Sequence, residues 1–301
     1  MIALRDGDAR VDVAPELGGA IVSYTWCARP VLRPTPASAL ATRNVRLASC
    51  YPLVPYSNRI RNATLAFQGR SYPLLRNFGT HPHAIHGVGW QRAWSIDVAE
   101  VNRAQLSLAH DPCVDGADTW PWPFRVTQTF ELSSSATMAA LSTTLTLDNT
   151  GTGRFPFGLG WHPFFVADAA TTIAFGARAV WQNDPTQLPV QSIAVPAELP
   201  FRDARPLAGL SIDNVFTGWS GHADLTNASA GLRATLSADR ACGCLVVYAP
   251  PRADFIALEP VTHETDAFNR HAAGAQDVGF RTLAPGCAFS CTMRVAVSAS
   301  A

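Results

Sequence analysis

The chain has 301 residues with 23 basic and 23 acidic side chains, so its formal net charge at pH 7 is zero. It contains no lysine, and all 23 basic side chains are therefore arginines. This excludes Schiff-base aldolases and pyridoxal enzymes, which need an amine, and nucleotidases that need a P-loop lysine. Zero net charge gives no general attraction to a polyanion, so we expect no nucleic-acid partner.

Alternation of apolar and polar side chains predicts strands along most of the chain. In chain order, the predicted strands are residues 20–26, 94–98, 105–109, 126–132, 141–147, 232–236, 245–249, 255–258 and 287–297. We expect residues 133–135 to connect the fourth and fifth strands as a turn. No segment keeps a helical period beyond about two turns. The pattern therefore predicts an all-β protein, either a large sandwich or a barrel.

The organisation of the chain indicates one domain. An all-β domain can reach this length, and we find no repeat, no low-complexity tract and no long linker, so we predict a single domain over residues 1–301. Residues 1–10 lack the apolar region of a secretory signal. No run approaches the roughly 18 apolar residues of a membrane span, so we expect no contact with a membrane.

The seven cysteines are an odd number and are scattered through the sequence. They predict free, buried thiols in a reducing cytoplasm rather than a disulfide framework. Cys242 and Cys244 form a CxC pair, but no second pair stands at zinc-ribbon spacing. We expect both to be core residues.

Three histidines, His81, His83 and His86, lie close together in the segment HPHAIHG. On an extended backbone the first two share a face and His86 lies on the other, so three converging metal ligands would require a turn. No carboxylate stands beside them, and we predict no metal site. Gly87 and Gly89 follow His86 and permit close backbone approach to a ligand, so we expect His86 to line a pocket.

Two further segments carry polar groups suited to a ligand. Asn58, Arg59 and Arg61 follow a proline-containing loop, and the arginine fork of donors matches hydroxyl pairs, carboxylates or phosphate. Either arginine could instead be a solvated loop charge. Asp213 only accepts hydrogen bonds when it is ionised, so it could hold sugar hydroxyls or form an Asx turn.

His162 lies between aromatic clusters in GLGWHPFF. One interpretation is a hydrogen-bonded core imidazole. The other is a proton donor in an aromatic cleft that excludes water and stacks on a sugar face. Glu259 directly follows the apolar run 255–258, and we expect it at the end of a buried strand. A buried carboxylate is costly unless it is paired, so it indicates either a functional site or a structural ion pair with an arginine.

In their order along the chain, these segments resemble the aldose 1-epimerase (galactose mutarotase) family. The matching stretches are YPLVPYSNRI, GRSYPLLRN, AIHG, GLGWHPFF, IDNVFTGW and ALEPVTHETDAFN. They span most of the chain, from Tyr51 to Asn269. The resemblance implies a large antiparallel β supersandwich with a sugar site in a cleft on one sheet, which agrees with the strand prediction.

The resemblance also implies roles for individual residues. Glu259 would be the catalytic base and His162 the general acid, while His86, Arg59, Asp213 and Asn58 would hold the substrate. The base removes the proton of the C1 hydroxyl and the acid protonates the ring oxygen, so the ring opens, rotates and closes as the other anomer. We expect the carboxylate to favour the imidazolium. The reaction implies no cofactor, and the oligomeric state stays open between monomer and homodimer.

The sequence leaves the substrate open. HGVGW lacks the second glycine that many family members carry directly after the first, and this changes a loop near the sugar. Some relatives use arginine clusters to act on phosphorylated hexoses, and Arg59, Arg61, Arg70 and Arg76 would permit such a site. Two other hypotheses are a non-catalytic sugar-binding or sensing module and a glycosidase that uses Asp213 and Glu259.

Overall fold

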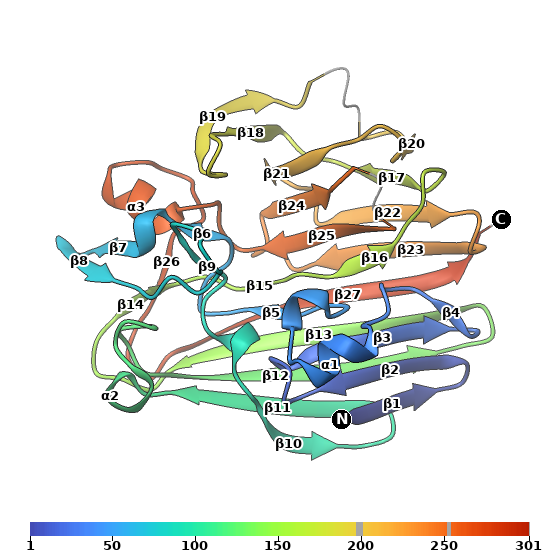
Figure 1. Cartoon of the computed structure of the whole chain (residues 1–301), viewed down its shortest axis with the longest axis horizontal. Helices are drawn as coiled ribbons and strands as arrows, with labels where there is room; N and C mark the ends of the chain where they lie inside the picture. Colours follow the sequence, from blue (N-terminus) through green and yellow to red (C-terminus); the bar gives the residue numbers. More distant parts are fainter. Residues whose placement is uncertain (197–200, 252–253, 301) are drawn as a thin grey trace.

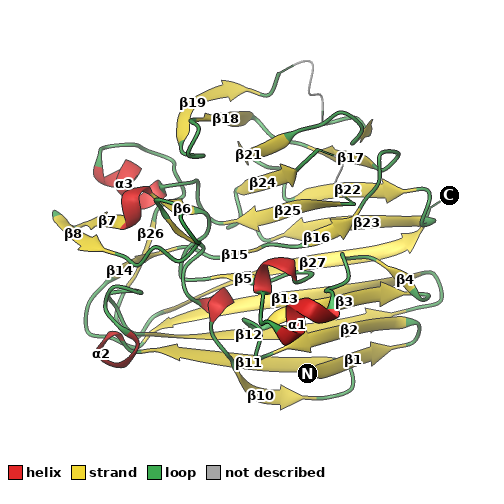
Figure 2. Ribbon diagram, viewed as in Figure 1, coloured by secondary structure: helices red, strands yellow, loops and turns green. Residues whose placement is uncertain are grey.

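The computed structural model describes residues 1–196, 201–251 and 254–300. Two layers of β-sheet pack on each other, as Figures 1 and 2 show. Apart from one parallel bridge between Val54 and Gly87, every strand pairing among these described residues is antiparallel. The structure therefore confirms the predicted all-β antiparallel supersandwich.

One layer is a nine-stranded sheet. In spatial order its strands are β10 (Ser95–Ala99), β11 (Arg103–His110), β12 (Phe124–Ser134), β13 (Met138–Asn149), β27 (Ala288–Ala299), β23 (Leu232–Ala238), β22 (His222–Asn227), β17 (Thr172–Phe175) and β20 (Arg205–Pro206). The predicted pairing of β12 with β13 is confirmed. The predicted turn is two residues early, because Ser133 and Ser134 still pair with β13.

The other layer joins two sheets. The eight-stranded sheet contains β19 (Pro189–Ala194), β18 (Ala179–Asn183), β21 (Ile212–Thr217), β24 (Cys244–Ala249), β25 (Phe255–Val261), β15 (Gly160–Trp161), β5 (Pro52–Leu53) and β16 (Phe164–Val166), which pairs with β25. The four-stranded sheet contains β1 (Ile2–Asp6), β2 (Ala9–Ala14), β3 (Ala20–Trp26) and β4 (Arg29–Pro30). Bridges Ile21–Cys50 and Leu32–Phe165 connect the two sheets.

Short strand pairs and short helices lie at one end and on one face of the sandwich. Three strand pairs are β14 (Phe155–Phe157) with β26 (Arg281–Leu283), β6 (Arg59–Ile60) with β9 (Ala84–Ile85), and β7 (Thr64–Phe67) with β8 (Arg70–Pro73). The helices are α1 (Ala37–Ala41), α2 (Pro112–Asp115), α3 (Ala267–Ala272), and the 3₁₀ turns η1 (Val45–Leu47), η2 (Arg61–Ala63) and η3 (Gly89–Gln91). In the described part of the chain, none of these is long and apolar enough to cross a membrane.

The core lies between the two layers and contains the inward-facing residues of nearly every strand, from Ile2 to Val297. A second apolar cluster covers the opposite face of the eight-stranded sheet, and it includes Val215, Val246, Ala257 and Val261. β25 therefore has apolar neighbours on both of its faces. Any polar side chain on this second face is shielded from water by apolar neighbours.

All seven cysteines are free, as predicted, but only Cys50, Cys242, Cys244 and Cys291 are buried. The expectation that all of them are buried is wrong for Cys27, Cys113 and Cys287, which are exposed. Cys242 and Cys244 do belong to the apolar clusters, so the prediction that they are core residues is confirmed.

Candidate active site

Glu259 lies within β25 rather than at its end, because the strand continues through Pro260 to Val261. Its alternate neighbours Ala257 and Val261 belong to the apolar cluster on the outer face of the sheet. Glu259 shares this face, and it pairs in register with Val246 of β24. The residue is only 3% exposed, so its carboxyl group is almost fully shielded from water.

His162 lies opposite Glu259 because of strand register. β15 pairs Gly160 with Val261, and β16 pairs Phe164 with Ala257, so the residue midway between them falls across from Glu259. The His162 Nε2 atom lies 3.1 Å from Glu259 Oε1. The second polar atoms of the two groups, His162 Nδ1 and Glu259 Oε2, are buried without a hydrogen-bond partner in the described chain.

Aromatic rings hold the imidazole of His162. Phe164 stacks on it with a centroid distance of 4.3 Å and an interplanar angle of 20°. Tyr51 packs beside it at 4.8 Å, and the backbone N–H of His162 donates to the Tyr51 carbonyl at 3.0 Å. The sequence drew attention to the motif that contains Tyr51 but assigned no contact to this residue. Its place beside His162 depends on pairing between distant segments.

His86 and Asn58 are linked through their backbones. The His86 N–H donates to the Asn58 carbonyl at 2.9 Å, and the Asn58 N–H donates to Nδ1 of His86 at 3.0 Å. Because Nδ1 accepts a hydrogen bond, a neutral His86 carries its proton on Nε2. The His86 and His162 ring centroids are 5.6 Å apart. His86 can therefore offer an N–H donor beside the acid–base pair.

Arg59 and Asp213 form the polar side of the site. Arg59 Nη2 lies 3.8 Å from Asp213 Oδ2, and Arg59 Nη1 donates to Asn58 Oδ1 at 2.9 Å. The Arg59 side chain is 18% exposed and that of Asp213 is 32% exposed. The structure thus groups all six residues predicted from sequence, and Asp213 lies in β21 rather than in an Asx turn.

Burial is the main cause of the pKa shifts of Glu259 and His162. It raises the pKa of Glu259 well above its ordinary value; Asp213 adds to the rise and Arg59 opposes it. Burial lowers the pKa of His162 to about 3, and Arg33 and Arg59 lower it further. The expectation that Glu259 keeps His162 as an imidazolium is wrong for the site as the structure has it, because desolvation disfavours both charged forms.

The chain is similar to known proteins along nearly its whole length. A family model described as aldose 1-epimerase matches residues 1–296. The chain belongs to the aldose 1-epimerase family. It is similar to the protein YphB of Escherichia coli K12, whose function is uncharacterised, with 31% identity over 94% of this chain and 93% of that one.

Solved structures of the family share its fold. A candidate aldose 1-epimerase from Escherichia coli K12 superposes with a TM-score of 0.86 at 30% identity, covering 99% of each chain. A galactose 1-epimerase from Lactobacillus acidophilus superposes at 0.78 with 17% identity, covering 99% of this chain and 93% of the other. At that identity the second likeness shows the fold alone.

The two glycines after His86 allow a close approach of the backbone to Val54. Gly87 has φ +69°, and a Cβ there would lie 2.2 Å from the Val54 carbonyl oxygen. A Cβ on Gly89 would lie 2.3 Å from Val54 Cγ1. That these glycines also admit a ligand stays a prediction. They let the His86 loop pack on the segment before Asn58.

The histidine-rich segment does not gather around one point. His83 accepts from the Asn62 N–H through Nδ1, and its Nε2 lies 3.1 Å from Thr186 Oγ1. Instead, His86, His162 and Glu259 have possible ligand atoms within 4.8 Å of one another. A metal-binding histidine normally donates its second N–H to an acceptor. His86 Nδ1 instead faces the Asn58 N–H, which favours a hydrogen-bonding role over metal binding.

The four arginines suggested for a phosphate site are not gathered at the pair. Arg61 lies 3.4 Å from Asp266 and its side chain is 50% exposed. Arg70 and Arg76 are exposed. Of the four, only Arg59 shifts the pKa of Glu259 or His162.

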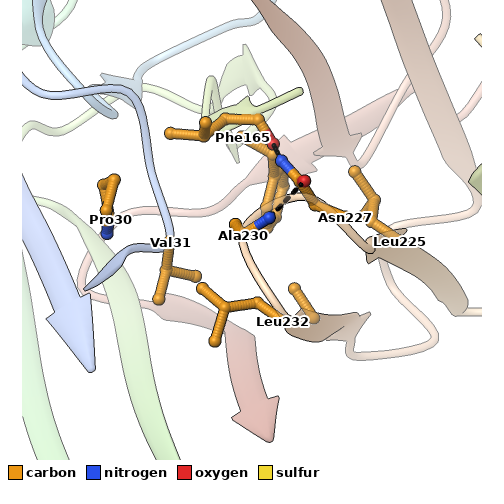
Figure 3. A pocket seen from close by; sticks show the side chains of 9 residues that line it. Pro30, Val31, Phe165, Leu225, Asn227, Ala230 and Leu232 are labelled. Carbon is orange, nitrogen blue, oxygen red and sulfur yellow. Dashed lines mark hydrogen bonds between the residues drawn. The ribbon is translucent and has the colours of Figure 1, made fainter. Parts of the chain in front are cut away.

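A separate cavity near β4 and β16 is too small for a sugar. Figure 3 shows its apolar lining, and its volume is about 20 Å³, room for about one water. Its one polar side chain, Asn227, is already satisfied, because Nδ2 donates to the Val166 carbonyl at 3.4 Å and Oδ1 accepts from the Ala230 N–H at 3.0 Å. This cavity is therefore no alternative to the acid–base pair.

Proposed function

We propose that this protein is an aldose 1-epimerase that interconverts the α and β anomers of a free aldose in the cytoplasm. The observation that carries the proposal is the 3.1 Å contact between His162 Nε2 and Glu259 Oε1, two side chains that are almost fully shielded from water. Family membership supports the same reaction class. The seven free thiols fit a reducing compartment.

The pair holds the proton that the reaction needs. A neutral imidazole with a protonated carboxyl, and an imidazolium with a carboxylate, contain the same number of protons. Because the two groups are in direct contact, one proton transfer between them interconverts these states. The low pKa of His162 and the high pKa of Glu259 favour the uncharged state before a sugar arrives.

A bound sugar favours the charged state of the pair. The C1 hydroxyl donates to the Glu259 carboxylate, and the ring oxygen accepts from the His162 imidazolium. Each group then completes its transfer, and the ring opens to the aldehyde. Rotation about C1–C2 followed by the reverse transfers closes the ring as the other anomer. Each positioned acid or base typically contributes roughly 10²–10⁴-fold.

The remaining residues hold the hydroxyl groups of the sugar. His86 offers a neutral N–H donor, since burial holds its pKa well below the ordinary value. Asp213 accepts hydrogen bonds, and Arg59 donates them from a guanidinium that is fixed by Asn58. A cation and an anion side by side suit a neutral polyol better than a phosphate, so we propose an unphosphorylated substrate.

The experiment is NMR saturation transfer between the anomeric protons of several free and phosphorylated aldoses. The wild-type protein should accelerate exchange, and Glu259→Gln and His162→Ala should each reduce it by roughly 10²–10⁴-fold. Glu131→Gln and His222→Ala alter exposed residues and serve as matched controls. Saturable sugar binding without acceleration would identify a binding module instead. Release of product from aryl glycosides would identify a glycosidase.

A further inference from the structure

Arg33 lies outside the acid–base pair but contacts its aromatic support. It follows β4, and its backbone N–H donates to the Phe164 carbonyl at 2.7 Å. Its guanidinium carbon lies 4.0 Å from the ring centroid of Phe164 and 4.5 Å from that of Phe255. Phe164 in turn stacks on His162 at 4.3 Å. One aromatic ring therefore contacts both the guanidinium and the imidazole.

The same guanidinium fixes the segment on the other side of His162. Arg33 Nη2 donates to the carbonyls of Arg46 and Ala48 at 3.2 and 3.0 Å. The chain then runs through Ser49, whose carbonyl accepts from the Phe164 N–H at 2.9 Å, to Tyr51. Arg33 thus binds both segments that pack on the imidazole of His162.

We propose that Arg33 is a positioning residue of the acid–base pair, which orders the aromatic support of His162 and places a positive charge against that support. The proposal rests on the proposed function, because it assigns Arg33 a part in that reaction. Only arginine suits both contacts, since a planar guanidinium stacks on a ring while its fork of donors binds two carbonyls.

Charged and titratable groups approach His162 from several elements. Glu259 lies on β25, Cys50 and Tyr51 precede β5, and His86 follows β9. Two cations act on it, Arg59 of β6 and Arg33 after β4, and both lower the pKa of His162.

These two cations differ in their partners. Arg59 lies 3.8 Å from Asp213, which partly offsets its charge. Tyr51, Asp254 and Tyr248 act on the charge of Arg33, none of them in an ion pair among the described residues, and its side-chain hydrogen bonds go to neutral carbonyls. Removing the charge of Arg33 should therefore change the protonation of His162 without breaking an ion pair.

The experiment measures the pKa of His162 by NMR in protein carrying labelled histidine, with His162→Gln used to assign the signal. In Arg33→Met the pKa should rise by about one unit, since a nearby like charge is removed. Arg33→Lys keeps the charge, so the pKa should stay near the wild-type value. Arg281→Met is the matched control, because Arg281 lies 5.3 Å from the Phe289 ring, and it should leave the pKa unchanged.

The pH profile of anomer exchange gives the second readout. Arg33→Met should move the limb of the kcat profile that His162 determines to higher pH. Arg33→Lys should leave the profile in place but lower kcat by about tenfold with little change in KM, because the imidazole support is looser. Rescue of the profile by lysine separates the charge from the packing.

Several outcomes would overturn the proposal. One is an Arg33→Met variant that is folded by circular dichroism but has an unchanged His162 pKa. Another is equal loss of activity in Arg33→Met and Arg281→Met with no shift of the profile. If Arg33→Met does not fold, the kcat of Arg33→Lys is the deciding measurement. A kcat of Arg33→Lys equal to that of wild type would overturn the positioning role. If wild type accelerates no anomer exchange, the proposed function fails, and the His162 titration still tests the charge effect.

Discussion

His162 and Glu259 face each other because Gly160 lets β15 approach β25 closely. A Cβ at Gly160 would lie 2.7 Å from Val261 Cγ1 and 2.8 Å from the Pro260 carbonyl oxygen. Gly160 is two residues from His162, and Pro260 and Val261 are the two residues that follow Glu259. The spacing between the two strands therefore sets the contact between the two catalytic candidates.

Gly160→Ala should separate the acid from the base. The added methyl group pushes β15 away from β25, so we expect a loss of kcat approaching 10²-fold, as small misplacements of catalytic groups produce. Overpacking should also lower the free energy of unfolding by about 1–3 kcal/mol. Anomer exchange kinetics and urea unfolding measure the two effects.

Gly243→Ala is the matched control for this change. A Cβ at Gly243 meets nothing within 4 Å in the described structure. The variant should keep wild-type activity and stability. Full activity in Gly160→Ala would show that the spacing of β15 and β25 does not limit the reaction.

Glu259→Gln should stabilise the protein at alkaline pH while it abolishes most activity. The pKa of Glu259 is raised in the folded state, so the folded protein retains this proton longer than the unfolded chain does. The stability from this group is full below the unfolded pKa of about 4.3 and is lost as pH rises through the folded pKa. Glutamine cannot ionise, so its Tm advantage over wild type should grow with pH.

Melting curves of Glu259→Gln and wild type across roughly pH 5 to 9 test this directly. Glu131→Gln, which changes an exposed carboxyl on β12, should show no such trend. A Tm difference that is constant with pH would contradict the raised pKa of Glu259.

His162→Gln should have the opposite pH dependence. The pKa of His162 falls to about 3 on folding, so at mildly acidic pH the unfolded chain binds a proton that the folded protein does not. The stability from the neutral imidazole is present above the unfolded pKa of about 6.5 and is lost as pH falls towards the folded value. Wild type should therefore lose more Tm on acidification than His162→Gln, as differential scanning calorimetry would measure.

The sequence predicted the strands that have one clear alternation, such as β12, β13 and β27, because burial on one face leaves a period of two. It also predicted the apolar strand that carries Glu259. It did not show that Glu259 lies inside β25, since Pro260 suggested an end. Pro260 removes one backbone N–H donor from the strand but does not end it, and β25 continues to Val261.

The convergence of the site could not be derived from spacing. His162 meets Glu259 through a strand register, and residues far apart in sequence determine that register. Arg33 was missed for a similar reason, because its importance depends on contacts with Phe164 and Ala48. The pKa directions also escaped prediction, since they follow from the depth of burial.

Asp213→Asn should weaken sugar binding more than it slows the chemistry. The change replaces an ionised acceptor with an amide and leaves Arg59 without its carboxylate at 3.8 Å. A hydrogen bond to a charged group contributes about 1.5–3 kcal/mol, so KM should rise by about 10- to 100-fold with a smaller fall in kcat. Asp224→Asn breaks a comparable pair with Arg233 at 3.5 Å on β22 and should leave KM unchanged. Equal KM values for wild type and Asp213→Asn would remove Asp213 from the substrate site and leave Arg59 and His86 as the groups that hold the sugar.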